Sequence, residues 1–338
     1  MNLDEYRKIL GGVVGKQNVL VGNNYNFERI KLTSPSMNYL FGGGIPRGVI
    51  LQLMGLEQTT KSLMALSIAA DIQRQTNKAV CYIEAAEVGY TTEHAANLGL
   101  DTEKTILVRA NTAEQALTSI KKVLGENKDS SPFCCVILDS VGGLVPEKLS
   151  DEDKDIGEVS AMGTRARLLS EALPIFSVKC VANDVVLILI NQMRSINLSG
   201  YGNPEGGMGG KAMAYYSSII ARLSKPSVKA EDSSGITGFD VHVVLTKTKY
   251  GKANRSIDLQ VVLEEDEEGR VKTYYDPIID VIKMGKKLGL IQVNGSFYSF
   301  TLSTGELIKV QGEKNLKAHL LANPAVLDEL RDLINVRI

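Results

Sequence analysis

The sequence has 338 residues, of which 44% are hydrophobic and 23% are charged, and its formal net charge is −1. This composition is typical of a soluble globular protein and excludes a global basic field, so any nucleic-acid binding must come from a local patch. The apolar runs are far shorter than the ~20 residues of a membrane span, and the first residues lack a secretory signal, which favours a cytoplasmic protein without a membrane partner.

Residues 1–30 are expected to form a short arm, with a two-turn helix at 3–10 and strand character at 16–21. So few residues cannot fold alone, and we therefore expect the arm to dock on another surface. A frayed terminus is the alternative interpretation.

An apolar run at 49–54 and an alanine- and leucine-rich run at 63–70 read as a strand and a helix joined by a short turn. The turn is Gly55-Leu56-Glu57-Gln58-Thr59-Thr60-Lys61-Ser62. Its backbone N–H groups and the positive helix end behind it form an anion seat for the phosphates of a nucleotide. Lys61 would reach the β and γ phosphates, and the Ser62 hydroxyl would hold Mg²⁺.

One position departs from the phosphate-loop pattern G-x-x-x-x-G-K-[ST], because Thr60 stands where the second glycine is expected. A β-branched residue tolerates fewer backbone torsions than glycine, so we expect that the loop does not rely on a positive φ at Thr60. The alternative to a phosphate loop is a plain strand–turn–helix with a chance Lys-Ser pair.

Aliphatic runs then alternate with helical patterns along the chain. We expect strands at 79–83, 106–108, 134–138, 185–190 and 241–246, and helices at 92–98 and 112–124. Near-continuous aliphatic strands separated by helices imply an α/β fold with a mainly parallel sheet covered on both faces.

Four of these strands run into polar residues, at Glu84, Asp139, Gln192 and Lys247. Open α/β sheets bind ligands at the carboxyl ends of their strands, so we interpret these residues as a site. Asp139 would be the second Mg²⁺ anchor beside Ser62, with a helix N-cap as its alternative role. Gln192 could sense the γ-phosphate, or it could be an ordinary hydrogen-bonding residue at the end of its strand.

A carboxylate is also needed to orient water toward the γ-phosphate. Glu87 is the candidate, and Glu84 is the competing choice. Spacing alone does not decide between them.

Two stretches, 151–167 and 193–211, have weak secondary-structure signals. A glycine-rich loop as long as the second is uncommon inside a compact domain unless it is functional. Backbone N–H groups, arginine, lysine and apolar wedges suit single-stranded nucleic acid with splayed bases. A disordered lid without a nucleic-acid partner is the alternative.

These segments carry a resemblance to a known family. The runs INQMR (190–194), YGNPE (201–205) and GGKA (209–212) resemble the second DNA-binding loop of the RecA recombinase family. Residues 138–146 resemble its Walker B segment, and 156–167 are similar to its first DNA loop. The likeness extends from about residue 32 to about residue 291.

The resemblance implies a DNA-dependent ATPase that uses ATP and Mg²⁺, forms helical filaments on single-stranded DNA, pairs it with homologous duplex and exchanges strands. Single-strand-binding protein and loader proteins are implied as further partners. The implied domains are an oligomerisation arm at 1–30, a RecA-like P-loop ATPase core at 31–268 and a small C-terminal α/β domain at 269–338.

Residue roles follow from the same resemblance. It favours Glu87 as the catalytic carboxylate, acting with Lys61 and Gln192. Lys247 and Lys249 fall on the paired lysines that reach the neighbouring subunit's ATP. His94 falls where the family stacks an aromatic ring on adenine. The implied DNA-binding residues are Arg165, Arg167, Arg194, Gly202, Asn203, Gly209, Gly210 and Lys211.

Thr60 departs from bacterial RecA, but the recombinases of T-even phages also lack glycine there, which favours a bacteriophage member. Two other classes share the core fold: a RecA-like regulator that exchanges no strands, and a hexameric helicase motor. Retention of Glu87, Asp139 and Gln192 argues against the regulator. The loop at 203–205 and the N-terminal arm argue against the helicase.

Overall fold

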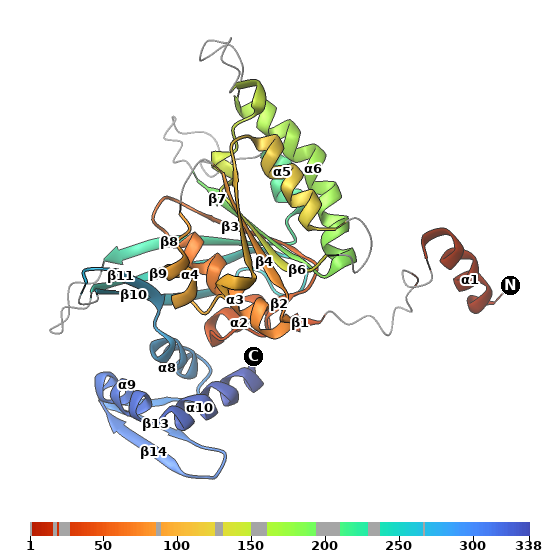
Figure 1. Cartoon of the computed structure of the whole chain (residues 1–338). Helices are drawn as coiled ribbons and strands as arrows, with labels where there is room; N and C mark the ends of the chain where they lie inside the picture. Colours follow the sequence, from red (N-terminus) through yellow and green to blue (C-terminus); the bar gives the residue numbers. More distant parts are fainter. Residues whose placement is uncertain are drawn as a thin grey trace, which may run out of the picture.

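The computed structural model describes residues 2–15, 19, 28–85, 89–125, 131–149, 161–193, 210–228, 237–265 and 268–338. Within them lies a nine-stranded central sheet (Figure 1). Its strands are β3 (Ile50–Gly55), β4 (Ala79–Ala85), β5 (Thr105–Ala110), β6 (Phe133–Asp139), β7 (Val186–Gln192), β8 (Ile219–Val228), β9 (Thr237–Thr248), β10 (Ser256–Glu265) and β11 (Val271–Tyr275). The strand order is β11-β10-β9-β8-β3-β7-β6-β4-β5.

The sheet is parallel from β8 through β3, β7, β6 and β4 to β5, and antiparallel from β8 to β11. Alternate strand side chains enter two apolar clusters. Leu51 and Leu53 pack in one with helix α3 (Lys61–Thr76), and Ile50 packs in the other with α5 (Ala113–Val123) and α6 (Ala161–Asn183). Burial on both faces explains the near-continuous aliphatic runs. The predicted α/β fold with a mainly parallel sheet is confirmed.

One strand runs against expectation. β9 is antiparallel to β8, and Lys247 lies opposite Ile220 near the start of β8. Leu51, near the start of β3, pairs with the neighbouring Ile219. The last residues of β9 therefore lie at the end of the sheet that is opposite the carboxyl ends of the parallel strands. The expectation that Lys247 shares one site with the other strand ends is wrong within a single chain. Over residues 241–246, β9 buries only alternate residues, Val241, Val243 and Leu245, as antiparallel strands with one solvated face do.

The shorter elements of the core begin where the sequence supplies caps. The Thr112 side chain accepts the backbone N–H of Gln115 and starts α5, as its sequence predicts. Around the sheet lie β1 (Arg29–Ile30), α2 (Pro35–Phe41), β2 (Ile45–Pro46), α4 (Thr92–Asn97) and α7 (Gly210–Tyr216), with 3₁₀ turns at Thr102–Lys104, Val141–Gly143 and Glu147–Leu149.

The N-terminal helix α1 (Leu3–Val14) starts with a reciprocal capping box between Asn2 and Glu5 and is longer than the predicted 3–10 helix. It stands apart from the sheet (Figure 1) and exposes apolar side chains such as Ile9 and Val13. The predicted strand at 16–21 lies mostly outside the described residues.

The C-terminal part follows the sheet directly. It contains α8 (Pro277–Lys287), β12 (Gln292–Asn294), β13 (Phe297–Thr301), β14 (Leu307–Gln311), α9 (Glu313–Ala322) and α10 (Pro324–Arg337). Because β11 pairs with β10, it is a strand of the central sheet, and we propose that the small domain begins near Pro277 instead of at residue 269. Within the described ranges, no helix is both long and apolar enough to cross a membrane.

Candidate functional site

The turn between β3 and α3 is a tight loop that needs glycine at its first position. A Cβ on Gly55 would lie 2.5 Å from the Thr59 hydroxyl and 2.6 Å from the carbonyl oxygen of Leu223, closer than any side chain tolerates. The Thr59 hydroxyl donates across the loop to the Leu56 carbonyl at 2.8 Å. The loop is therefore fixed by its own bonds and by its contact with β8.

Thr60 lies in the left-handed region, with φ 60° and ψ 29°, and Gln58 also has a positive φ of 57°. The expectation that the loop avoids a positive φ at Thr60 is wrong. The backbone keeps the shape that glycine would adopt freely, although this shape costs a non-glycine residue roughly 1–2 kcal/mol. Its side chain and carbonyl both contact the hydroxyl of Tyr275, a residue that the sequence alone did not bring to this loop.

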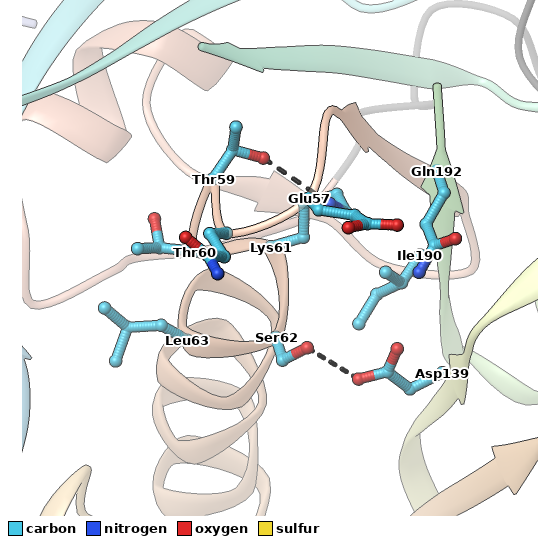
Figure 2. A pocket seen from close by; sticks show the side chains of 10 residues that line it. Glu57, Thr59, Thr60, Lys61, Ser62, Leu63, Asp139, Ile190 and Gln192 are labelled. Atoms are coloured by element: carbon cyan, nitrogen blue, oxygen red, sulfur yellow. Dashed lines mark hydrogen bonds between the residues drawn. The ribbon is translucent and has the colours of Figure 1, made fainter. Parts of the chain in front are cut away.

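The lysine, hydroxyl and carboxylate predicted for phosphate and metal binding meet in one place. The Ser62 hydroxyl donates to Asp139 Oδ2 at 2.6 Å (Figure 2). The Lys61 Nζ donates to the Leu56 carbonyl at 2.6 Å and is largely buried. The elements responsible are the first turn of α3 and the end of β6.

Tyr82 is a further site residue that sequence reasoning missed. Its hydroxyl, inside the core, donates to Asp139 Oδ2 at 2.6 Å. Burial and the Asp139 charge raise the pKa of Tyr82, so the hydroxyl stays protonated and keeps donating. Only the register of β4 against β6 reveals the contact, because the run around Tyr82 reads as ordinary apolar strand.

Lys61, Ser62 and Asp139 line a pocket of about 480 Å³ beside the loop (Figure 2). Its lining residues are Glu57, Gln58, Thr59, Thr60, Lys61, Ser62, Leu63, Asp139, Ile190 and Gln192. Gln192 pairs with Gly55 in the β3–β7 register, and the Met193 N–H donates to the Gly55 carbonyl at 3.0 Å. Gln192 thus stands between the pocket and the segment that follows Met193.

Of the two glutamates considered for water activation, Glu84 is held by structural bonds. One carboxylate oxygen accepts the N–H groups of Gly89 (3.0 Å) and Tyr90 (2.9 Å), and the other accepts Arg109 Nε at 3.1 Å. Glu84 is also buried. Glu87 lies outside the described residues.

Three predicted ATP residues lie away from the pocket lining. His94 sits on α4, half-buried, and burial lowers its pKa. Lys247 Nζ donates to the carbonyls of Ala214 (2.6 Å) and Tyr215 (3.0 Å) at the end of α7. Burial, and then the nearby charge of Lys249, lower the pKa of Lys247, while Lys249 itself is exposed.

The ends of the two predicted DNA loops converge. Gly210, which starts α7 with a φ of 73°, lies so that an added Cβ would be 3.5 Å from the Ala166 side chain on α6. Arg165 and Arg167 flank Ala166, and Lys211 follows Gly210 at an exposed position. The remaining predicted DNA-binding residues, Arg194, Gly202, Asn203 and Gly209, lie outside the described residues.

A strand-to-helix loop with a lysine, a hydroxyl paired to a strand-end carboxylate and a pocket beside them define the class of P-loop nucleotide-binding α/β proteins. Comparison with known proteins specifies the family. The family model of the RecA N-terminal domain matches residues 8–267. The chain belongs to the RecA family.

Full-length relatives agree with this assignment. Protein RecA of Campylobacter lari is 29% identical over 340 residues, which cover 98% of this chain and 92% of that protein. Protein RecA of Ehrlichia ruminantium is 31% identical over 294 residues, covering 86% and 76%. Protein RecA of Cereibacter sphaeroides is 28% identical over 292 residues, covering 86% and 79%.

The predicted function is confirmed at this level. The protein is a recombinase and a DNA-dependent ATPase that binds nucleotide and single-stranded DNA and forms filaments, and it acts in DNA recombination and repair. A regulator without strand exchange and a hexameric helicase motor are not favoured. The bacteriophage origin stays a prediction.

Proposed function

We propose that the loop at 55–62 binds the phosphates of ATP and that Ser62 and Asp139 together hold Mg²⁺. The contact that carries this proposal is the 2.6 Å bond between the Ser62 hydroxyl and the Asp139 carboxylate beside Lys61. Hydroxyl and carboxylate oxygens are ligands that Mg²⁺ prefers, and the Tyr82 hydroxyl keeps Asp139 oriented. When bound, Mg²⁺ would neutralise charge that develops on the β and γ phosphates.

The protein's own groups would then do the following work. Lys61, bonded here to the Leu56 carbonyl, would turn to the β and γ phosphates. Glu87 would orient the attacking water, because the bonds of Glu84 to Gly89, Tyr90 and Arg109 give that carboxylate a structural role. Gln192 would contact the γ-phosphate from the pocket wall.

Single-stranded DNA would be held where the two loop ends converge. Gly210 lies beside Ala166, so the starts of α6 and α7, which carry Arg165, Arg167 and Lys211, are adjacent. Arg194, Gly202, Asn203 and Gly209 would complete the surface. Because the second loop begins just after Gln192, a change at the γ-phosphate could reach the DNA without crossing the core.

Lys247 and Lys249 would act on the ATP of a neighbouring subunit. They lie at the end of the sheet opposite the pocket, so they cannot contact the nucleotide bound by their own subunit. The apolar face of α1 would dock on the neighbour, and His94 would stack on adenine. Homologous duplex DNA, single-strand-binding protein and loader proteins would be the further partners, in the cytoplasm or, for a phage protein, in that of the host.

The direct test is Lys61→Ala, compared with Lys78→Ala, which removes an exposed lysine beyond the end of α3. Because backbone dipoles cannot replace the Lys61 charge, DNA-stimulated ATP hydrolysis should fall by at least about 100-fold in Lys61→Ala and stay at the parental rate in Lys78→Ala. Parental hydrolysis by Lys61→Ala would show that the site is elsewhere.

A further inference from the structure

Thr60 places a strained backbone inside the phosphate loop. Its left-handed torsions are easy for glycine and unfavourable for a β-branched residue, so the loop of this chain does not hold this shape by intrinsic preference. A contact from outside the loop can contribute the missing free energy. The loop's own bonds, from Thr59 and Lys61 to the Leu56 carbonyl, do not involve Thr60.

The Thr60 carbonyl accepts the Met64 N–H of α3 at 3.0 Å, and a second contact with Thr60 comes from the edge of the sheet. The Thr60 Oγ1 lies 3.1 Å from the Tyr275 hydroxyl, and that hydroxyl donates to the Thr60 carbonyl at 3.4 Å. A reciprocal pair satisfies both groups, because the threonine hydroxyl can donate to the tyrosine oxygen while the tyrosine proton goes to the carbonyl. Burial raises the pKa of Tyr275, which keeps that proton in place.

We propose that the Tyr275 hydroxyl is a positioning residue for nucleotide binding, which holds Thr60 in the left-handed conformation that glycine supplies in the standard loop pattern. The inference rests on the proposed role of residues 55–62 as the phosphate seat. The bond fixes the direction of the Thr60 peptide groups, and therefore the direction in which the loop presents its N–H groups. Tyr275 acts through Thr60 and needs no contact with the phosphates.

The position of Tyr275 also links the loop to the C-terminal part. Tyr275 ends β11, and the next residue, Asp276, caps α8 by accepting the N–H groups of Ile278 and Ile279 at 3.0 Å each. The other Asp276 oxygen accepts Lys317 of α9 at 2.6 Å. The shape of the phosphate loop is thus tied to the junction where the small domain begins.

The test is a cycle of Tyr275→Phe, Thr60→Gly and the double variant in the full-length protein. The affinity for a fluorescent ADP analogue with Mg²⁺ is measured for each, together with the unfolding temperature without nucleotide. Phenylalanine keeps the ring, so only the hydroxyl is removed. Tyr274→Phe is the matched control, because the Tyr274 hydroxyl donates to Glu264 instead, at 3.2 Å.

In the Thr60 background, Tyr275→Phe should weaken nucleotide binding by about three- to ten-fold, since the strain it leaves uncompensated is of order 1 kcal/mol. In the Thr60→Gly background the same change should have less than about a two-fold effect, because glycine needs no support. Tyr274→Phe should leave affinity unchanged in both backgrounds.

Equal losses from Tyr275→Phe in the two backgrounds would overturn the proposal, because the hydroxyl would then act on the nucleotide or on the whole fold. No loss in the Thr60 background would overturn it as well. Lys61→Ala, run alongside, separates this failure from failure of the phosphate seat itself. If Lys61→Ala bound the analogue as tightly as the parent, the assignment of residues 55–62 as the phosphate-binding loop would be wrong, whatever the tyrosine variants showed.

Discussion

The Asp139 carboxylate shows how single residues position this site. One of its oxygens, Oδ2, accepts two hydroxyl bonds of 2.6 Å, from Ser62 on α3 and from Tyr82 in the core. The tyrosine bond fixes the carboxylate from the protein side, while the serine bond faces the pocket. A metal ion held by the oxygens of the Ser62 hydroxyl and the Asp139 carboxylate would therefore find one ligand already oriented.

Substitutions of Glu84 and Glu87 should distinguish a structural role from a catalytic one. Glu87→Gln keeps the shape but cannot accept a proton, so we predict that hydrolysis falls about 100-fold or more while ATP-bound filaments form and persist. Glu84→Gln weakens bonds to Arg109 and two N–H groups, so it should lower the free energy of unfolding by about 1–3 kcal/mol and leave most of the hydrolysis.

ATPase rates, filament lifetimes and urea unfolding of both variants check this ranking. If Glu84→Gln stopped hydrolysis while Glu87→Gln hydrolysed ATP normally, the catalytic role would belong to Glu84.

Among single residues, the sequence predicts those whose chemistry follows from local spacing. Lys61, Ser62 and Asp139 meet as expected because the loop motif and the strand end constrain them. Tyr82 and Tyr275 could not be predicted, because each contact depends on strand pairing between distant segments. Residue preference alone also gave the wrong φ at Thr60, where the left-handed torsions occur together with a tertiary contact to Tyr275.

Among the elements, the starts of α6 and α7 form the described part of the proposed DNA surface. Gly210 packs against Ala166, so the residues that follow the two loops lie together although they are far apart in the chain. The ion pair of Arg167 with Glu171, at 3.7 Å and with both side chains 66% exposed, is weak enough to be exchanged for a phosphate.

Arg167→Ala and Lys211→Ala should each weaken binding to single-stranded DNA almost equally for all sequences. Each should also reduce the slope of log affinity against log salt concentration by about 0.7, the value for one phosphate contact on a single strand. Titrations at several salt concentrations check this, with Lys78→Ala as control. An unchanged slope in both variants would show that the starts of α6 and α7 do not contact the DNA phosphates.

Strand direction marks the limit of sequence reasoning about elements. The aliphatic run of β9 resembles those of the parallel strands, yet it pairs antiparallel with β8 and places Lys247 at the far edge. Over residues 241–246, β9 buries only alternate residues, a pattern typical of antiparallel strands, so treating it like the continuously buried parallel strands predicted the layers of the fold correctly and the location of this one residue wrongly.

In the whole molecule, the position of Lys247 and Lys249 bears on how subunits assemble. The pocket with Lys61 lies at one end of the sheet, and Lys247 and Lys249 lie at the opposite end. A filament can therefore bring the lysines of one subunit to the pocket of the next. A site shared in this way is complete only between subunits. The apolar face of α1, exposed in the single chain, offers a second contact.

Specific ATPase activity should therefore rise with protein concentration, and removal of residues 1–24 should weaken filaments while sparing the core fold. A mixture of Lys61→Ala and Lys249→Ala subunits should recover part of the activity that each lacks, because some interfaces pair an intact loop with an intact lysine. Absence of recovery at every mixing ratio would indicate a site complete within one chain.

We expect the nucleotide pocket to control the DNA surface through Gln192, which lines the pocket and lies just before the second loop in the sequence. The most direct measurement is the affinity for single-stranded DNA with and without a non-hydrolysable ATP analogue, in the parent and in Gln192→Ala. We predict that the analogue strengthens DNA binding strongly in the parent and little in Gln192→Ala, although both bind the analogue. Equal strengthening in the two proteins would contradict the claim.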